Sequence, residues 1–421
     1  MERVLTGQQS EVVIAGAGPA GISTALFLAK KGIRSILIDK ETFPRDKICG
    51  DGLSGWVITM LRRIDPELLK KLQQSPDQLP SHGVRFFAPN MQSIALPYSN
   101  AKFPDDPPGH VIRRIDFDRL LMDEAKGNPL IEVIQGVAIG HIENGDDKVT
   151  LVDTTGNRRF SGKMCVIATG AGSKLARSLM HGAMGDKDRA TGIRQYYQGV
   201  TGVYAENFVD FYFLDDFLPG YLWVFPLPDG RANVGAGIRT DILKKRKLKL
   251  KQVMENALTN NPHLAERFKH AEAISAPAAR ELPLGSKKIP LSGDRFLLTG
   301  DAGSLIDPFT GEGVGNAMWS GYAAAEHIAN ALSANRFDAA YNKNYDRFVY
   351  KKLWKELRLS TWIQKLINYP KLFNWVINKV TRHPDLKQSL IRMIDDLDER
   401  KKLTKISFYI RLLSRKSAKP T

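Results

Sequence analysis

The sequence has few of the features that mark secreted, membrane-spanning or fibrous proteins. It contains 2 cysteines in 421 residues, too few for a disulfide framework. No apolar run approaches the roughly 18 residues of a membrane span, and the polar start Met1–Ser10 lacks the apolar core of a signal peptide. These absences exclude a disulfide-rich or membrane-spanning protein and favour a cytoplasmic location.

Acidic residues are scarce at one end of the chain. The net charge is +16, and from Tyr341 to Thr421 there are 20 Lys and Arg residues against 7 Asp and Glu. A second basic run covers Lys244–Lys251. Such runs form solvated helix faces, or surfaces for anionic lipids and acidic ligands. Because no nucleic-acid-binding motif accompanies them, we expect no nucleic-acid partner, and we expect no bound metal.

What is present is an ordinary globular composition, 43% hydrophobic and 25% charged. At ~150 residues per domain, the length predicts two or three structural units. The apolar runs Glu11–Gly16 and Arg34–Asp39 flank an apolar-periodic stretch that begins at Pro19. This pattern predicts a strand–helix–strand unit that opens a parallel sheet.

Further elements follow from the same patterns. We predict strands at Val137–Glu143, Val149–Asp153, Met164–Ala168 and Arg295–Thr299, a helix at Gly313–Leu332, and helices after Arg336 punctuated by Pro370 and Pro384. The aromatic, β-branched block Gly192–Arg239 has a hairpin turn at Pro228-Asp229-Gly230. This block predicts an antiparallel sheet inserted into the parallel-sheet unit, and it is a candidate substrate domain.

A GxGxxG motif lies between the first strand and the first helix, with the sequence Gly16-Ala17-Gly18-Pro19-Ala20-Gly21. Its first Gly suits a tight turn, the second lets the backbone approach a pyrophosphate, and the third lets helix and strand pack closely. Asp39, followed by Lys40, closes the second strand, where a carboxylate would bind the adenosine ribose. The motif predicts a bound dinucleotide and leaves its identity open.

Two later segments resemble the FAD-binding motifs of the glutathione-reductase-type flavoproteins. Gly300-Asp301-Ala302-Gly303 precedes a turn with Gly311, Gly313 and Val314, and Cys165–Ala171 places Gly170 after a strand. The resemblance implies that Asp301 binds the ribityl chain and that the helix at Val314 points its N-terminus at the flavin or the pyrophosphate. It also implies one non-covalent FAD, with Arg114 reaching the flavin side of the cofactor; Arg113 is the alternative match.

Two segments narrow this resemblance to the geranylgeranyl reductase family. Phe43–Ser54 contains Cys49-Gly50-Asp51-Gly52-Leu53, similar to a segment near that family's active site, and Pro219–Pro226 is similar to its PxxYxWxFP substrate motif. Tyr221, Trp223 and Phe225 alternate on one strand face, which suits an isoprenoid chain and equally a sheet core. Cys49 is a candidate catalytic residue or a small buried hydrophobe.

The fold class implied is α/β: a Rossmann-like FAD-binding domain with a parallel sheet and an inserted antiparallel substrate-binding sheet, followed by a helical region. The expected divisions are 1–75, 105–180 and 280–335 for FAD, 76–104 and 181–279 for substrate, and 336–421 for the basic helical region. The implied activity is reduction of isolated C=C bonds in a prenyl chain by hydride from reduced flavin. The alternatives are a flavin monooxygenase or halogenase-like enzyme, and a prenyl-lipid carrier without catalysis.

The reductant and the membrane complete these expectations. A single dinucleotide fingerprint predicts that NAD(P)H docks transiently or that another reductant replaces it. The basic tail predicts peripheral attachment to an anionic membrane. The residues expected at the acyl boundary are Trp354, Leu357, Trp362, Ile363, Leu366, Leu372, Phe373, Trp375 and Val376, with Lys352, Lys355, Lys365, Lys371 and Lys379 at the headgroups. A helical lid that covers the flavin domain is the alternative interpretation.

Overall fold

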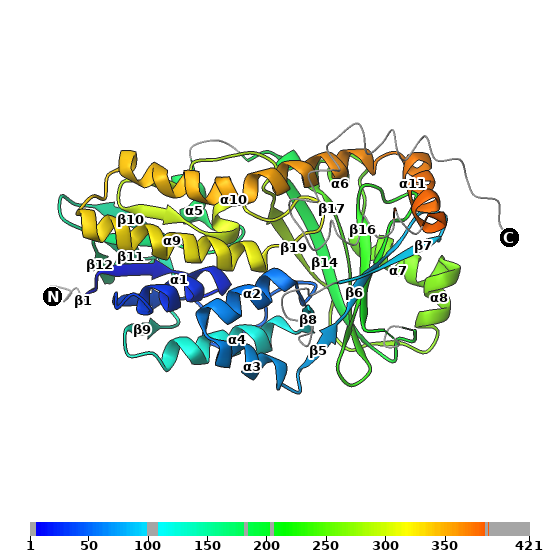
Figure 1. The fold of residues 1–421 in the computed structure, drawn as a ribbon, viewed down its shortest axis with the longest axis horizontal. Helices are drawn as coiled ribbons and strands as arrows, with labels where there is room; N and C mark the ends of the chain where they lie inside the picture. The colour runs from blue at the N-terminus through cyan, green and yellow to red at the C-terminus, as the bar shows by residue number, and fades with distance from the viewer. Residues whose placement is uncertain (1–5, 99–107, 181–183, 203–205, 384–385, 387–421) are drawn as a thin grey trace.

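The computed structural model describes residues 6–98, 108–180, 184–202, 206–383 and 386. Two large sheets divide the molecule in Figure 1: a parallel sheet with its helices on the left, and a mainly antiparallel sheet on the right. The expected α/β fold with an inserted antiparallel sheet is therefore confirmed.

The parallel sheet forms from short apolar runs that are covered on both faces. Every residue of its central strands is buried, which is typical of parallel strands between layers. Strand β20 runs antiparallel at one edge. In order across the sheet the strands are β20 (Ser292–Gly293), β21 (Phe296–Leu298), β13 (Met164–Ile167), β2 (Val12–Ala15), β3 (Ser35–Ile38) and β9 (Ile131–Ile134). The predicted strands near residues 12, 35, 165 and 296 are confirmed.

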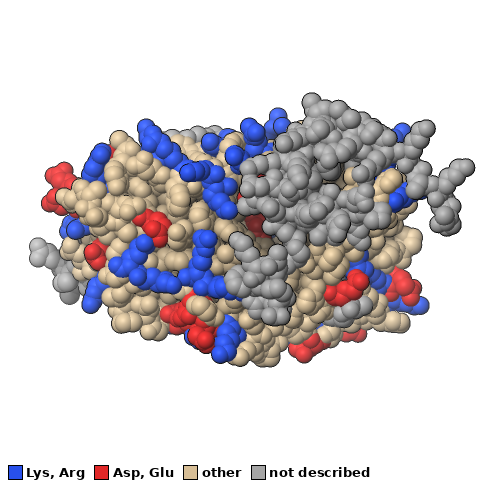
Figure 2. Space-filling view, viewed as in Figure 1, with Lys and Arg blue, Asp and Glu red and all other residues tan. Residues whose placement is uncertain are grey.

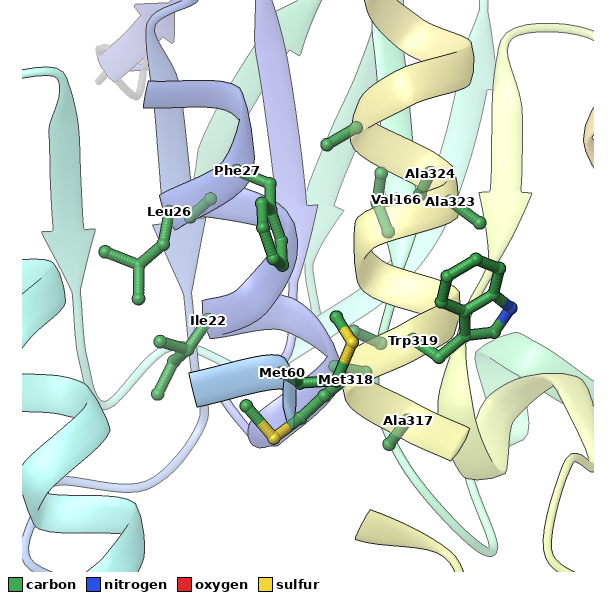
Figure 3. Close-up of a cluster of buried hydrophobic side chains, with 14 of the residues drawn as sticks. Ile22, Leu26, Phe27, Met60, Val166, Ala317, Met318, Trp319, Ala323 and Ala324 are labelled. Carbon is green, nitrogen blue, oxygen red and sulfur yellow. The ribbon is translucent and has the colours of Figure 1, made fainter. Parts of the chain in front are cut away.

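Helices cover this sheet, and two of them pack at close range. A Cβ atom on Gly321 would lie 2.5 Å from the carbonyl oxygen of Ala20, so only glycine permits this approach. Figure 3 shows Phe27 of α1 pointing toward α9, which carries Met318 and Trp319 in the same core. The helices of this half are α1 (Pro19–Ala29), α2 (Gly55–Ile64), α3 (Pro66–Gln73), α4 (Arg114–Lys126), α5 (Lys174–Leu179) and α9 (Val314–Ala334), with 3₁₀ turns at Asp186–Asp188 and Gly300–Gly303.

Two smaller sheets complete the half of the molecule that contains the parallel sheet. We call it the flavin-side half, after the cofactor expected there. The first consists of β1 (Thr6–Gln9), β12 (Arg158–Gly162), β11 (Val149–Asp153) and β10 (Ile139–Asn144); the second of β4 (Gly52–Leu53), β8 (Gly109–Ile112) and β5 (Gln78–Ser81). Strand β12 was not predicted, because its sequence Arg-Arg-Phe-Ser-Gly has a single apolar residue. Phe160 alone supplies the apolar contact of that strand with the core.

The second large sheet combines distant segments of the chain. Its order is β18 (Glu272–Ala273), β14 (Arg189–Gln198), β17 (Arg231–Arg239), β16 (Tyr221–Leu227), β15 (Phe208–Tyr212), β6 (Gly83–Phe87) and β7 (Ser93–Pro97), and β19 (Ala278–Pro283) also pairs with β14. The predicted turn joins β16 to β17 as an antiparallel hairpin. The domain division stays a proposal, and β19 crosses its expected boundary at residue 279.

Helices lie on both faces of this sheet. Residues of α7 (Leu250–Asn260) and α8 (Pro262–Phe268) join one apolar cluster with its strands, and α6 (Thr240–Lys245) packs beside them. On the other face, α11 (Pro370–Arg382) packs against strands β6, β7, β15 and β16. Apolar residues of α11 therefore belong to the same clusters as the predicted aromatic residues of β16.

The helix α10 (Ala339–Leu366) runs along the top of Figure 1 from the parallel-sheet half to α11. The predicted break at Pro370 is confirmed, because α11 begins there. Pro384 and residues 387–421 lie outside the described part of the chain, together with the predictions made for them. Among the described helices, none is both long and apolar enough to cross a bilayer.

Part of the expected membrane-facing set is wrong. Leu357 is 1% exposed and packs in the core of the flavin-side half. Ile363 and Phe373 pack beside Phe213, while Trp375 and Val376 join the cluster on β16. These side chains contact protein because an apolar period marks a face that covers something, without saying whether that is protein or lipid. Trp362 and Leu372 are exposed, each at 40%.

Candidate active site

The three glycines of the first motif have different surroundings. Gly16 has φ +104°, and a Cβ there would overlap the carbonyl of Ala168. A Cβ on Gly21 would overlap the carbonyl oxygen of Gly16. By contrast, a Cβ on Gly18 would meet only Arg45, at 3.9 Å. Two glycines therefore allow close packing, and the middle one leaves open space before α1.

The N-terminus of α1 fits a phosphate group. Gly18 is its N-cap, Pro19 follows, and neither a side-chain cap nor an acidic residue is present in the first turn. Helix N-termini of this kind present free N–H groups and a partial positive charge to an anion. Together with the space at Gly18, this geometry fits a dinucleotide pyrophosphate.

Asp39, just after β3, holds this turn in place by hydrogen bonds. Its carboxylate accepts hydrogen bonds from the backbone N–H of Ala17, at 2.6 Å, and of Glu41, at 2.8 Å. Lys40 points to solvent and pairs with Glu41 at 3.2 Å. The binding of a ribose by Asp39 stays a prediction, and Lys40 has no contact with the turn.

The second motif lies beside the first at the carboxyl ends of the strands. Gly300 has φ +58° and donates its N–H to Ser320 Oγ at 2.8 Å. Asp301 pairs with Lys47 Nζ at 3.2 Å, and burial lowers the pKa of that lysine despite the nearby carboxylate. Lys47 lies in the segment before Cys49, but its pairing with Asp301 was not expected from the sequence.

In the turn before α9, unlike the turn before α1, a side chain of the protein already bonds to the N-terminus of the helix. Gly311 has φ +72°, Gly313 is the N-cap, and Val314 is the first helical residue. The Glu312 carboxylate accepts the N–H of Gly315 at 2.7 Å, and burial raises the pKa of Glu312. One N–H group of this helix end therefore already has a carboxylate partner.

The third motif places Gly170, with φ +73°, just after β13. Arg280 Nη2 donates to the carbonyl oxygen of Ala171 at 3.1 Å and so joins this turn to β19. Cys165 on β13 is fully buried, and burial raises the pKa of its thiol. Cys165 is therefore a core residue.

Arg114 is buried, with 1% exposure. It donates to both carboxylate oxygens of Asp118, at 2.8 and 2.7 Å, and lies near the Cys49 side chain. Burial disfavours its charge, but the Asp118 carboxylate outweighs burial and holds the pKa of Arg114 above its ordinary value. Arg45 also donates to Asp118, at 2.6 Å. Arg114 thus lies near the candidate catalytic cysteine, and its reach to a flavin stays a prediction.

The three aromatic residues of β16 meet the flavin-side loops. Tyr221 Oη donates to the Thr310 carbonyl oxygen at 2.9 Å. Gly50 and Gly52 lie so close to Phe225 that added Cβ atoms would be 3.2 and 3.1 Å from its ring. Trp223 lies flat on the sheet, where a Cβ on Gly235 would overlap its indole ring. The structure thus brings the predicted aromatic face and the predicted cysteine loop together.

The loop that carries Cys49 is tied to the sheet by a polar network. Asn233 on β17 accepts the indole N–H of Trp223 at 2.9 Å and donates to the Cys49 carbonyl oxygen at 2.8 Å and to Asp51 Oδ2 at 2.7 Å. Cys49 itself is a half-buried free thiol. The sequence analysis missed Asn233, and no spacing could reveal it because 184 residues separate it from Cys49.

Comparisons with known proteins agree with this geometry. A family model described as "FAD binding domain" matches residues 9–347. A digeranylgeranylglycerophospholipid reductase of Thermoplasma acidophilum is 26% identical over 84% of this chain and 86% of its own, and a menaquinone reductase of Mycobacterium tuberculosis is 26% identical over 80% and 81%.

Solved structures share the fold. A geranylgeranyl bacteriochlorophyll reductase-like protein of Thermoplasma acidophilum has a TM-score of 0.80 at 22% identity, over 95% of this chain and 99% of its own. A flavin-dependent brominase has a TM-score of 0.77 at 22% identity, over 96% and 100%. The fold is therefore common to reductases and halogenases, and the residues in the site must separate them.

Proposed function

The chain belongs to the FAD-binding domain family, and from that premise we propose that it reduces isolated C=C bonds in the prenyl chain of an isoprenoid lipid. Two kinds of relative with lipid substrates in their names support this class of substrate. The observation that carries the proposal is the aromatic face of β16, which lies against the Cys49–Gly52 loop and beneath α11. Such an apolar surface suits a hydrocarbon chain.

The residues that would hold FAD come from all three motifs. The turn Gly16–Gly21 and the N-terminus of α1 would bind the pyrophosphate, and Asp39 the adenosine ribose. Asp301 would bind the ribityl chain, displacing its ion pair with Lys47. Gly170, Gly311, Gly313 and Val314 would line the remaining turns around the cofactor. When bound, FAD supplies the hydride.

The chain's own residues must assist hydride transfer, because an isolated alkene is not electrophilic. A proton must arrive as positive charge develops at the more substituted carbon. Tyr221 and Trp223 would face this charge and stabilise it by cation–π attraction, by ~2 kcal/mol in a desolvated site. Cys49, near Arg114, belongs to the loop that contacts Phe225 and Asn233. The cover of α11 would keep water away from the reacting carbon.

A flavin monooxygenase or halogenase-like activity is the second candidate. The brominase match favours it at the level of fold alone. Halogenases carry Gly-Glu-Ser where this chain has Cys49-Gly50-Asp51-Gly52, and a Trp-x-Trp-x-Ile-Pro segment where it has Tyr221 and Phe225 in place of Trp and Ile. These departures favour the reductase. A carrier without catalysis is disfavoured by the intact Gly300-Asp301 motif.

NAD(P)H as a transient reductant belongs to the same proposal. The described residues contain a single dinucleotide-binding turn, at Gly16–Gly21, and that turn is taken by FAD in this scheme. A pyridine nucleotide would therefore reach the flavin only in passing. Stopped-flow mixing of the oxidised protein with NADPH, NADH or a chemical reductant would rank the donors by their rates of flavin bleaching.

Peripheral membrane attachment is supported by the outer side of α10. Its exposed basic residues recur every three or four positions over most of the helix: Lys343, Arg347, Lys351, Lys355, Arg358 and Lys365. On the face shown in Figure 2, Lys and Arg side chains gather where Figure 1 has this helix. Trp362, Tyr369 and Leu372 are exposed near its C-terminal end. Cations with exposed aromatics suit an anionic bilayer surface.

The test of the proposed function uses the Trp223→Ala variant. Pre-reduced, FAD-loaded wild type is mixed anaerobically with a geranylgeranyl lipid, and we expect the oxidised-flavin band to return as the lipid gains two hydrogens. Trp223→Ala should slow this step about thirtyfold, from the loss of ~2 kcal/mol, with the flavin spectrum unchanged. Trp354→Ala, a partly buried tryptophan on α10, is the control. Wild type that leaves the lipid unreduced would refute the proposal.

A further inference from the structure

The reduction proposed above requires a proton as well as a hydride, and the site contains a carboxyl group that the preceding scheme leaves unused. Asp51 is 0% exposed and lies directly after Gly50 in the cysteine loop. It adopts φ +67°, which is unusual for a residue with a side chain. This conformation turns the carboxylate toward the sheet, where it meets two side chains on the aromatic face.

Three hydrogen bonds hold the Asp51 carboxylate. Oδ1 accepts the backbone N–H of Arg114 at 3.2 Å. Oδ2 accepts Asn233 Nδ2 and Tyr196 Oη, each at 2.7 Å. Of these partners, the Tyr196 hydroxyl is the one that can both donate and accept a proton.

Tyr196 connects this buried carboxylate to the apolar cluster on the aromatic face of β16. On the sheet, Tyr196 of β14 stands opposite Asn233 of β17, which stands opposite Phe225 of β16. Because these positions are in register, Tyr196 shares the face of Trp223 and Phe225. Unlike Asp51, Tyr196 is only partly buried, and it packs in the cluster that contains Trp223 and Phe373.

We propose that Tyr196 and Asp51 form the proton-delivering pair of the proposed reduction. The Tyr196 O–H bond breaks as a C–H bond forms at the substrate carbon that does not receive hydride. The Asp51 carboxyl O–H bond breaks at the same time and restores the phenol. The products are a saturated carbon–carbon bond, an intact Tyr196 and an Asp51 carboxylate, which solvent protonates before the next turnover. This inference rests on the proposed function.

The charges around Asp51 are consistent with this role. Burial raises the pKa of Asp51 to about 6, against the opposing hydrogen bonds from Asn233 and Tyr196. The charged or titratable groups that act on it are Tyr196 and Arg194 on β14, and the backbone N–H of Arg114 on α4 also bonds to it. Arg194 in turn pairs with Asp46 at 2.8 Å, and the Arg114 side chain pairs with Asp118. The carboxyl group can therefore exchange its proton close to neutral pH.

Tyr196 needs the protonated form of Asp51. Burial raises the pKa of Tyr196, and the negative charge of Asp51 raises it further. Protonation of Asp51 removes this charge and so lowers the pKa of Tyr196. The guanidinium of Arg194 lies 4.1 Å from the centre of the Tyr196 ring and favours negative charge on the phenol oxygen during transfer. The proton-transfer rate should therefore fall as the pH rises above about 6, by about tenfold per pH unit.

The first experiment needs no substrate. Infrared difference titration of the FAD-loaded protein follows the protonated carboxyl band of wild type minus Asp51→Asn, and we expect a midpoint near pH 6. Tyr196→Phe should shift that midpoint because it removes one donor to Oδ2. A midpoint near pH 4, unchanged in Tyr196→Phe, would overturn the pair even in a chain that fails to reduce prenyl lipids.

The second experiment measures single-turnover oxidation of the pre-reduced protein by a geranylgeranyl lipid across pH. Asp51→Asn and Tyr196→Phe should each slow it at least 100-fold, the usual contribution of a general acid, with FAD occupancy retained. Asp51→Glu should recover rate and pH dependence. The control is Tyr197→Phe, which alters a buried phenol that bonds to Gln195.

The outcomes separate the inference from the function on which it rests. Variants with the wild-type rate and pH profile, in a chain that reduces the lipid, would overturn the proton-delivering pair and leave the proposed function standing. Absence of lipid reduction by wild type would refute the proposed function, and the infrared midpoint would still decide whether Asp51 titrates as stated. If Asp51→Asn fails to fold, Tyr196→Phe gives the same decision.

Discussion

The flavin-side turns and the aromatic face of β16 are built in different ways. In the turns, backbone atoms form the expected phosphate site. Gly16 and Gly21 allow segments to pack without overlap, and the N-terminus of α1 presents its N–H groups. On the aromatic face, side chains from β14, β16 and β17 meet a loop of the other half. A site made by backbone tolerates almost no added atom, whereas a site made by side chains can change its chemistry while the fold persists.

Gly21→Ala should produce the largest effect, because it adds an atom where backbone already lies. The new Cβ would overlap the Gly16 carbonyl oxygen, and we expect the free energy of unfolding to fall by at least about 4 kcal/mol. Chemical denaturation without added FAD measures this. Gly18→Ala is the matched control: it meets only Arg45, at 3.9 Å, and should change that free energy by less than ~0.5 kcal/mol while weakening FAD binding. Equal losses in both variants would contradict the division of roles.

The second-largest effect concerns the aromatic face, where Asp51 should make the free energy of unfolding depend on pH. The pKa of Asp51 rises on folding from 3.8 to about 6 because the group is buried. Between these values the folded state holds a proton that the unfolded state has lost, so stability falls as the pH rises through this window. Two pKa units correspond to about 3 kcal/mol.

Asp51→Asn removes this dependence. Urea unfolding at pH 4 and pH 7.5 should show the variant gaining about 2.5 kcal/mol relative to wild type as the pH rises, since pH 4 already lies just above the unfolded pKa. Any constant cost of the amide cancels in this difference. A variant that tracks wild type at both pH values would mean that the folded Asp51 titrates as an ordinary carboxyl group.

Asp301→Ala tests the side chain that we expect to contribute most to FAD binding in the flavin-side turns. We expect FAD to bind more weakly by ~1.5 to 3 kcal/mol, since a charge-assisted hydrogen bond to the ribityl chain would be lost. Loss of the partner also frees Lys47, so Lys47→Met combined with Asp301→Ala separates the two contributions. Titration of the flavin-free protein with FAD gives the affinities. Undiminished binding by Asp301→Ala would show that the backbone alone holds the cofactor.

The difference between the halves explains what the sequence could predict. The GxGxxG and Gly-Asp turns are local, so their spacing predicts both the geometry and the cofactor. By contrast, Trp223 contacts Gly50 and Gly235 only because of how the strands and loops pair in the folded chain. The spacing of residues in one sequence does not reveal that pairing. The proton-delivering pair joins residues 145 positions apart. Part of the expected membrane-facing set is wrong for another reason: Leu357 and Trp362 are both expected on one apolar face, but five positions apart they lie on different sides of α10, so one faces the core and the other is exposed.

The smallest expected effect concerns α10, the helix that spans both halves in Figure 1. Its exposed lysines and arginines would attract an anionic bilayer, each by ~1 kcal/mol. Lys355→Gln should therefore weaken binding to vesicles that contain an anionic lipid about fivefold, measured by flotation at low salt. Lys148→Gln, an exposed lysine outside α10, is the charge-matched control and should have no effect.

The distribution of these effects locates the attachment relative to the two halves. Lys343 lies at the flavin-side end of α10, while Lys365 lies near the exposed Trp362 and Leu372. If the bilayer supplies a prenyl chain to the space under α11, Lys365→Gln should weaken binding more than Lys343→Gln, and Trp362→Ser should weaken it even at high salt, because apolar insertion is not screened. Equal losses at both ends would place α10 flat on the headgroups. Binding that persists on neutral vesicles in all variants would rule out electrostatic attachment, because the charge of α10 would then be only a solvated face.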